Sequence, residues 1–414
     1  MIALLRLAAF RWLFLGRTVT SLGSAVAPIA LGFAVLDLTG SLTALGLVVA
    51  SRSIAQVGVL LLGGVLADRW SRHIVLAGSQ LLAAVAQAVV ATVVLTGAAT
   101  VPLLAALGVV NGAAAGSGFP ATAALVPQTV PAAVLRRANA MSRLGVVTAL
   151  IGGAALGGLL VAGAGPGWGL AISAATFAVA AACFLQIKII GGPGPVAGDS
   201  VLADLREGWT EFCSRRWVVV VVSQYFVVNA CFQGSLIVLG PAVADASFGR
   251  AGWGMALATF NLGMVLGGLI AMRWQPRHAL RWGVALGLVN VIPLSVLASI
   301  PNAAAVAAAF LLLGVSIEQF VVAWDVSLQE NVPTDRLARV YSYDALGSFS
   351  AIPLGQALLG PLAEAFGVKP VLLGCAGLIA AATLLALASK SVRSLERRPL
   401  GEKASETLEW SQTY

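Results

Sequence analysis

The chain contains about twelve apolar stretches that are each long enough to cross a lipid bilayer. A transmembrane helix needs about 20 mostly apolar residues, and inside lipid only helices or closed barrels satisfy every backbone hydrogen bond. The alternating pattern of barrel strands is absent from the sequence. We therefore predict an all-α polytopic membrane protein with 12 transmembrane helices. The predicted spans cover residues 10–35, 42–66, 74–96, 102–127, 140–163, 167–190, 217–243, 250–272, 279–299, 303–330, 338–364 and 368–388.

Composition indicates the same class. Hydrophobic residues make up 59% of the chain and charged residues 10%, whereas about a quarter of the residues in a soluble domain are charged. The net charge of +8 needs no nucleic acid to explain it, because basic residues beside a membrane face anionic lipid. We therefore expect the lipid bilayer, and no nucleic acid, as the partner of this positive charge.

Two loop segments of the chain occur twice. GGVLADRWSRH, at residues 63–73, returns as GGLIAMRWQPRH at residues 267–278, with an offset of 204 between the matched glycines. VPAAVLRRANA from Val130 matches VPTDRLARVYS from Val332, with an offset of 202. The offset equals six spans, and both copies run in the same direction. Parallel repeats of this kind build known secondary-transporter folds, so we predict two parallel six-helix pseudo-repeats.

These repeats predict the domain boundaries. We expect an N-terminal bundle at residues 1–190 and a C-terminal bundle at residues 217–388. The segment between them, residues 191–216, contains GGPGP followed by charged DLREGWTEF, which indicates a cytoplasmic linker with a short surface helix. The polar residues 389–414 indicate a disordered cytoplasmic tail.

The positions of the basic residues predict the orientation. With the N-terminus in the cytoplasm, 21 of the 25 Lys and Arg residues fall in cytoplasmic segments, as the positive-inside rule requires. The outside loops hold Arg250 and Lys369, and the spans hold Arg17 and Arg52. Both termini are therefore expected to be cytoplasmic. The abundance of Arg, Ala and Gly suggests a GC-rich genome, and hence a bacterial cytoplasmic (inner) membrane.

A glycine and three charged residues lie close together in the loop between spans two and three: Gly64, Asp68, Arg69 and Arg72. Glycine lets neighbouring helices approach closely, and Asp68 can accept hydrogen bonds from helix N-terminal amides or from an arginine. We interpret the group as a cytoplasmic gating motif. The alternative is that Arg69 and Arg72 only satisfy the topology rule.

The string from Gly64 through Asp68, Arg69 and Arg72 to His73 resembles the signature loop of the major facilitator superfamily. Ser71 stands where that pattern has its second glycine, and His73 where it has its last basic residue. In the second copy Met272 replaces the acid, so only the first copy can serve as a charged latch. The resemblance implies the major facilitator fold.

Longer stretches resemble the drug:proton antiporter branch of that superfamily, which includes macrolide and enterobactin exporters: ALVPQTVPAAVLRRANAMSR, GGAALGGLLVAGAGPGW and WDVSLQENVPTDRLARVYSYDALGSFSAIPLGQALLGPLA. This resemblance implies export of an antibiotic-like, drug-like or siderophore-like compound by proton antiport, and hence a role in multidrug or antibiotic resistance. Two positions depart from the branch. No carboxylate follows Ser21, Gly23 and Ser24 in span one, and Gly152–Gly153 replaces the usual Gly-Pro of span five.

Three acidic residues lie inside the predicted spans and away from the span ends, where a charge costs about 2.5 to 3.5 kcal/mol: Glu318, Asp325 and Asp344. All three are proton-coupling candidates, because a desolvated carboxylate can load and release a proton near neutral pH. Glu318 is the leading candidate, since it lies near the middle of span ten. Asp325 and Asp344 have an alternative role as structural partners of Arg17, Arg336 or Arg339.

The intramembrane basic residues are Arg17 and Arg52. Arg17 can extend its charged end to the membrane surface, whereas Arg52, in the middle of span two, needs a partner or a wet cavity. An ion pair and an anionic substrate explain Arg52 equally well.

Phe226, Asn229 and Gln233 recur at helical spacing in span seven. The resemblance implies that this span lines the central cavity, which makes the three residues substrate-cavity candidates. Hydrogen bonds between helices are the alternative explanation.

Other function classes lack their motifs. The sequence has no P-loop for an ATP-driven pump, and its cysteines lack CxxC spacing. His73 and His278 lie in the repeated loops, so we expect neither an enzyme, nor a metal site, nor any cofactor beyond the proton gradient. One chain contains two bundles, so we expect a monomer that works on protons and a small-molecule substrate.

These residues lead to a hypothesis of alternating access. Protonation of Glu318, relayed through Asp325, would weaken an ion pair and favour one facing. The latch of Asp68 and Arg72 would stabilise the outward-open state. A proton-coupled importer or facilitator of a small metabolite on the same fold is the alternative function.

Overall fold

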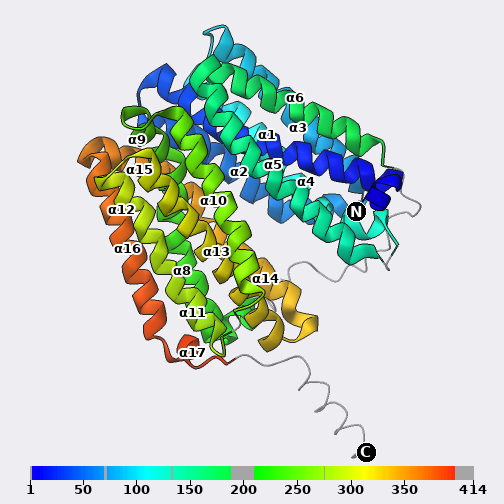
Figure 1. Ribbon diagram of the computed structural model, residues 1–414, viewed down its shortest axis with the longest axis vertical. Coiled ribbons are helices and arrows are strands. Elements are labelled where there is room, and N and C mark those ends of the chain that lie inside the picture. Colours follow the sequence, from blue (N-terminus) through cyan, green and yellow to red (C-terminus); the bar gives the residue numbers. More distant parts are fainter. Residues whose placement is uncertain (1, 70–71, 132–133, 188–208, 275, 397–414) are drawn as a thin grey trace, which may run out of the picture.

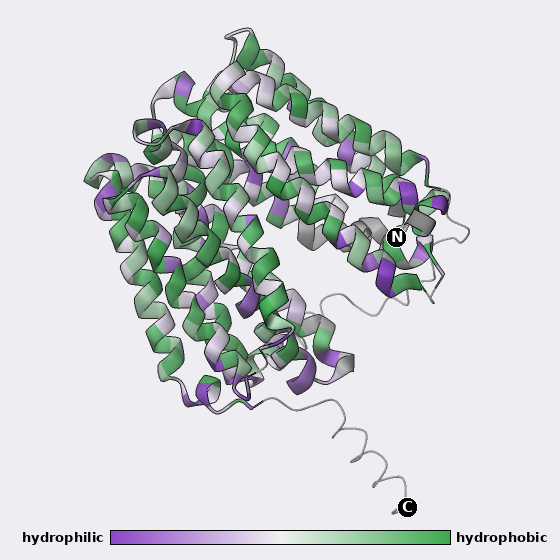
Figure 2. Cartoon of the chain, viewed as in Figure 1, coloured by the Kyte–Doolittle hydropathy of each residue, from purple (hydrophilic) through white to green (hydrophobic). Residues whose placement is uncertain are grey.

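The computed structural model describes residues 2–69, 72–131, 134–187, 209–274 and 276–396 (Figure 1). Its regular elements are all helices, and twelve helical segments are long and apolar enough to cross a membrane. Hydrophobic residues cover the lengths of these helices, whereas many hydrophilic residues lie at the helix ends and in the loops (Figure 2). The predicted all-α membrane fold with 12 spans is therefore confirmed.

The first half of the chain forms six long helices after a short 3₁₀ helix, η1 (Ile2–Arg6). They are α1 (Ala8–Thr39), α2 (Leu42–Arg69), α3 (Arg72–Leu95), α4 (Val101–Thr129), α5 (Leu135–Ala164) and α6 (Pro166–Leu185).

The second half forms six spans, three of which are interrupted. It comprises α8 (Arg216–Gly234), η3 (Ser235–Leu239), α9 (Gly240–Ala246), α10 (Gly249–Ala271), α11 (Ala279–Leu286), η4 (Gly287–Asn290), α12 (Val291–Ser299), α13 (Ala303–Asn331), α14 (Thr334–Phe349), α15 (Ala351–Phe366), α16 (Val368–Ala388) and α17 (Lys390–Arg393).

Each interruption has a proline as its cause. A proline lacks the N–H that would bond the carbonyl four residues earlier, and its ring crowds that carbonyl. The π-helical turn η3 lies just before Pro241, the 3₁₀ turn η4 just before Pro293, and α14 ends just before Pro353. Lipid offers no water to replace a lost backbone bond, so the helix rewinds locally into tighter or wider turns.

The sequence repeat reappears in helix packing. Helix α2 packs along α4 in the first half, and α10 packs along α13 in the second. A Cβ added to Gly112 of α4 would lie 2.0 Å from the carbonyl oxygen of Arg52, and one added to Gly314 of α13 would lie 2.1 Å from that of Phe260. These two glycines are separated by the same 202 residues as the second pair of repeated loops. Both helix pairs therefore depend on backbone contact at corresponding places.

The two halves form a wedge. Figure 1 shows the two sets of helices converging at the end that carries α9 and diverging toward η1 and α17. The main contacts between the halves are those of α5 with α10 and of α2 with α15. In the expected orientation, with both termini in the cytoplasm, the wedge is open on the cytoplasmic side.

The predicted linker helix is seen in part. Residues 209–214 are helical, whereas residues 188–208 and the tail residues 397–414 lie outside the described residues. Glu211 forms ion pairs with Arg215 and, at 2.7 Å, with Arg336. These two guanidiniums, Arg215 first, hold the pKa of the Glu211 carboxyl below its ordinary value. The linker helix is thus attached to the start of α14.

Candidate functional site

An ion pair joins the two halves at Glu318. Nη2 of Arg143, on α5, lies 2.6 Å from Oε1 of Glu318, on α13. The carboxylate is buried with 6% of its side chain exposed, whereas 73% of the Arg143 side chain is exposed. The long, largely exposed side chain of Arg143 in the first half thus reaches a buried acid in the second half.

Glycines on α10 make room for this acid. A Cβ added to Gly267 would lie 2.9 Å from Cβ of Glu318, and one added to Gly268 would lie 3.7 Å from Oε1. Helix α10 can therefore pass directly over the carboxylate. Gln319 adds a second contact between the same helices, because its Nε2 donates to the carbonyl of Gly267 at 2.5 Å.

The Arg143–Glu318 pair lies far from the place where the two halves touch. Helices α5 and α10 meet at Gly158 and Gly254, where an added Cβ would lie less than 3 Å from the opposite backbone. Fifteen helical residues separate Arg143 from Gly158, which corresponds to about 22 Å at 1.5 Å per residue. The ion pair therefore spans the seam toward the open end of the wedge.

Asp325 and Asp344 receive hydrogen bonds from neutral donors. The hydroxyl of Tyr341 donates to Asp325 at 3.1 Å, and Trp324 Nε1 donates to Asp344 at 2.9 Å. The Ser348 hydroxyl is a second donor to Asp344, at 3.2 Å.

The arginines expected beside these acids have other contacts. Arg17 donates to the Ser142 hydroxyl at 3.1 Å, and Arg336 pairs with Glu211. The expectation that Arg17 pairs with Asp325 or Asp344 is therefore wrong, because its side chain turns toward α5. The side chain of Arg339 lies outside the described residues.

Arg52 lines a cavity between the two halves. The cavity measures about 70 Å³ and is bounded mainly by α1, α2, α3 and α4, with Ile237 of η3 and Gln356 of α15 closing it from the second half. Nε of Arg52 donates to Oδ1 of Asn111 at 3.1 Å, and Nδ2 of Asn111 donates to Oε1 of Gln87 at 3.2 Å. This chain of hydrogen bonds fixes the plane of the guanidinium.

Among the described residues, the guanidinium of Arg52 has no acidic partner. Within the part of the chain that the structure describes, no carboxylate lies within ion-pair distance of its guanidinium. The ion pair that was one of two explanations for Arg52 is therefore not seen among these residues.

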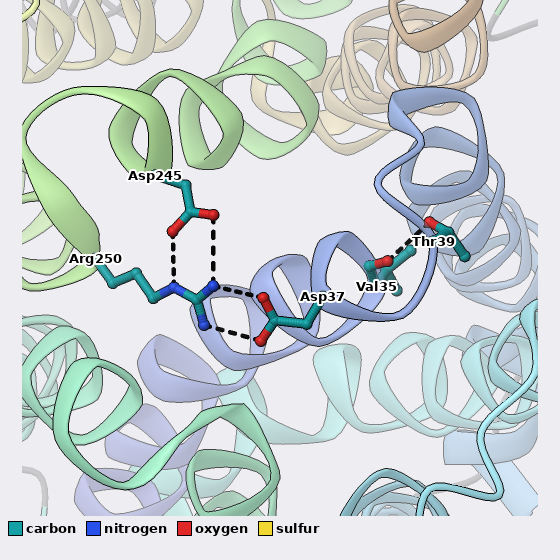
Figure 3. Close-up of polar contacts among 5 residues, drawn as sticks. All are labelled: Val35, Asp37, Thr39, Asp245 and Arg250. Atoms are coloured by element: carbon teal, nitrogen blue, oxygen red, sulfur yellow. Dashed lines mark hydrogen bonds and ion pairs between the residues drawn. The ribbon is translucent and has the colours of Figure 1, made fainter.

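A second cluster of charges joins the halves at the closed end of the wedge (Figure 3). Arg250 at the start of α10 binds Asp37 of α1, with Nη1 2.9 Å from Oδ2, and Asp245 of α9, with Nε 2.8 Å from Oδ1. Its guanidinium also lies over the ring of Phe33, 4.9 Å from the centroid. Asp37 belongs to the first half and Asp245 to the second, so one arginine holds both.

Glu364 makes another contact between the halves at this end. It accepts hydrogen bonds from the Ser41 hydroxyl at 2.7 Å, the Thr43 backbone N–H at 3.0 Å and the Thr43 hydroxyl. A carboxylate of α15 thus binds the N-terminus of α2, where helix dipoles favour negative charge.

The three substrate-cavity candidates of span seven differ in their burial and contacts. Nδ2 of Asn229 donates to the backbone carbonyl of Ser348 at 3.0 Å, which is a hydrogen bond between α8 and α14. Phe226 is 37% exposed and Gln233 is half-buried. The three residues do not line the cavity around Arg52.

The side chains of the loop motif Gly64, Asp68, Arg69 and Arg72 lie outside the described residues. The backbone of α2 ends at Arg69 and that of α3 begins at Arg72, so the gating role of the motif stays a prediction.

Several site residues were missed by sequence reasoning. Asn111, Gln87 and Gln356 are amides inside predicted spans, and a search for every polar side chain within the spans would have found them. Arg143 was counted only as a cytoplasmic charge. Asp37, Asp245 and Glu364 lie at or beyond the outer ends of the predicted spans, where an acid gives no sign of function.

Comparison with known proteins identifies the family. The sequence profile of the Major Facilitator Superfamily matches residues 13–355. The chain belongs to the major facilitator superfamily. We found no match among curated protein sequences.

Solved structures of transporters share the fold of this superfamily member. The D323A mutant of nucleoside transporter NupG superposes with a TM-score of 0.77 at 15% identity, over 92% of this chain and 99% of that one. A bacterial homolog of the human lysosomal transporter Spinster, described as inward-facing and unoccupied, gives 0.71 at 15% identity over 95% and 98%. The peptide transporter POT in complex with sulfate gives 0.71 at 15% identity over 94% and 96%. At this identity the likeness shows the fold alone.

Proposed function

We propose that the protein is a secondary active transporter that exports a small organic compound in exchange for protons by alternating access. The ion pair between Arg143 and Glu318 carries this proposal. It joins the two halves only while Glu318 is ionised, so protonation removes an attraction that favours one arrangement of the halves over the other. A ligand or proton shifts a conformational equilibrium only through such a difference between states.

The structure represents one of the two facings in this mechanism. Arg250 and Glu364 close one end of the wedge, and the halves diverge at the other end. With the termini in the cytoplasm this is the inward-facing arrangement. We propose that Asp68 and Arg72 form the corresponding latch when the cytoplasmic end closes, so that Asp68→Asn impairs transport while leaving the protein inserted.

Export is proposed because the segments from Pro131 to Arg143 and from Trp324 to Pro361 resemble drug exporters. Uptake of a small metabolite on the same fold is the alternative, because the fold itself does not fix direction.

The test uses everted membrane vesicles from an exporter-deficient bacterium that expresses the chain. The vesicles are energised and offered a panel of dyes, antibiotics and a catecholate siderophore, with and without a protonophore. Accumulation that the protonophore abolishes would support proton-driven export. Accumulation only in right-side-out vesicles would instead support the importer.

Glu318→Gln tests the coupling residue in the same vesicles. We expect it to lower gradient-driven accumulation at least tenfold, because the neutral amide cannot exchange the proton. Glu396→Gln, at an exposed carboxylate beyond α17, is the matched control and should transport normally. Full gradient-driven transport by Glu318→Gln would exclude Glu318 as the proton carrier.

A further inference from the structure

We propose that the cavity around Arg52 binds the negatively charged end of the transported compound, and that this compound carries a hydrogen-bond donor beside its anionic group. The inference rests on the proposed transport function and specifies its substrate class as a hydroxylated or N–H-bearing organic acid.

Arg52 has hydrogen-bond donors that no described residue uses. Its Nε bonds Asn111, and the other two nitrogens of the guanidinium have no hydrogen bond to any residue that the structure describes. A guanidinium presents its N–H groups in a planar fork that matches the two oxygens of a carboxylate. A charge in the middle of a membrane span is costly unless a counter-charge is supplied. An anionic ligand supplies it.

The opposite wall of the cavity holds an unpaired acceptor on Gln356. Gln356 is buried, with 5% of its surface exposed, and its Oε1 is a buried acceptor without a hydrogen-bond partner in the described residues. A buried acceptor left unpaired costs about 1 to 3 kcal/mol. A hydroxyl or N–H of the ligand, next to its anionic group, would satisfy this oxygen.

The size of the cavity limits what it holds. Sites for whole drug-sized ligands have roughly 300 to 1,000 Å³, whereas this cavity measures about 70 Å³. It therefore accommodates the charged end of a compound. Its other walls are mostly apolar, including Leu31, Val49 and Leu107, which suits the carbon skeleton next to a carboxylate.

The position of the cavity links binding to the transport cycle. Arg52 belongs to α2 and Gln356 to α15, and these helices touch where a Cβ added to Gly46 would lie 2.4 Å from the Gln356 carbonyl oxygen. A ligand held by both residues stabilises the closed end of the wedge. Separation of α15 from α2 would remove one of the two contacts and release the ligand.

The experiment measures equilibrium binding of radiolabelled salicylate to the full chain in lipid nanodiscs without any gradient. Salicylate carries a carboxylate with an adjacent hydroxyl. Benzoate lacks the hydroxyl and methyl salicylate lacks the charge. We expect salicylate to bind, benzoate to bind about fivefold more weakly, and methyl salicylate to compete at least tenfold more weakly.

Variants assign these differences to the two residues. Arg52→Gln should weaken salicylate binding at least tenfold. Gln356→Leu should weaken it about fivefold and remove the preference over benzoate. Glu396→Gln, at the exposed carboxylate beyond α17, should bind salicylate as the wild type does.

Two outcomes would overturn the proposal. One is the absence of salicylate binding by folded wild-type protein at millimolar concentration. The other is binding that Arg52→Gln leaves unchanged while its elution profile shows a folded monodisperse protein. Either result leaves the transport proposal intact, since that proposal depends on gradient-driven movement in vesicles.

Discussion

Helix pair α2–α4 of the first half and pair α10–α13 of the second are packed alike but hold opposite charges. Each pair closes on glycines that meet the facing backbone, Gly112 in one and Gly314 in the other. The first pair holds Arg52 and no acid that pairs with it among the described residues. The second holds Glu318, which is paired with Arg143 from the other half.

This difference shows how two repeated halves of one fold can acquire different roles. In each case the charge lies in one half and a polar group of the other half approaches it: Arg143 reaches Glu318, and Gln356 shares the cavity of Arg52. Glu318 is paired with a cation, whereas Arg52 has no carboxylate partner among the residues that the structure describes. The paired acid, Glu318, suits the proposed proton exchange, and the arginine, Arg52, suits the proposed ligand binding.

The largest expected effect comes from blocking the shared packing. Gly112→Ala and Gly314→Ala should each lower stability by about 1 to 3 kcal/mol, because the new Cβ would meet a backbone carbonyl that no rotamer change can relieve. The midpoint of thermal unfolding in detergent measures this. Gly152→Ala is the matched control, since nothing lies within 4 Å of its added Cβ. Unchanged midpoints in both variants would show that the two pairs do not depend on these contacts.

A charge exchange tests the occupied pair. Arg143→Glu alone places two carboxylates together and should reduce gradient-driven transport more than tenfold, as should Glu318→Arg alone. The double variant restores an attraction across the seam and should recover transport at least several-fold above either single variant. A double variant as inactive as both single variants would argue against the attraction between the halves.

Supplying Arg52 with an acid makes the first pair resemble the second. Asn111→Asp places a carboxylate beside the guanidinium, 3.1 Å from Nε in the position of the present amide oxygen. Salicylate binding in nanodiscs should weaken about tenfold, because the internal acid competes with the ligand. Asn111→Leu removes the hydrogen bond without adding charge and should bind within about threefold of the wild type. Equal losses in the two variants would contradict competition by charge.

The smallest effect is expected at the closed end. Asp37→Asn removes the ion pair of Arg250 with the first half, whereas Asp245→Asn removes an ion pair within the second half. Exposed ion pairs contribute about 0.2 to 1 kcal/mol, so Asp37→Asn should raise the population open at this end by up to about fivefold and Asp245→Asn by less.

Spin labels at Leu38 and Lys369, both exposed, measure that opening as a distance distribution, in a background from which the exposed Cys213 is removed. A larger shift in Asp245→Asn than in Asp37→Asn would show that Arg250 does not hold the halves together.

The sequence predicted the spans well because a membrane helix needs a long apolar run, and that requirement is local. It also singled out Glu318 and Arg52, since intramembrane charge is rare. It assigned Arg143 to the cytoplasmic surface, because the reach of a long side chain across a seam depends on where the partner helix lies. It offered one of three arginines as the structural partner of Asp325 and Asp344, whereas Trp324, Tyr341 and Ser348 are the donors that the structure shows.

By itself the sequence determined that the chain crosses the membrane in twelve helices and that its halves repeat, because hydropathy and self-similarity are properties of consecutive residues. Only the tertiary structure decided which charges meet. Arg143 and Glu318 are 175 residues apart, and Gln356 reaches the cavity of Arg52 from the other half. Such contacts are set by helix packing through glycines and by the angle between the halves, which no local pattern encodes.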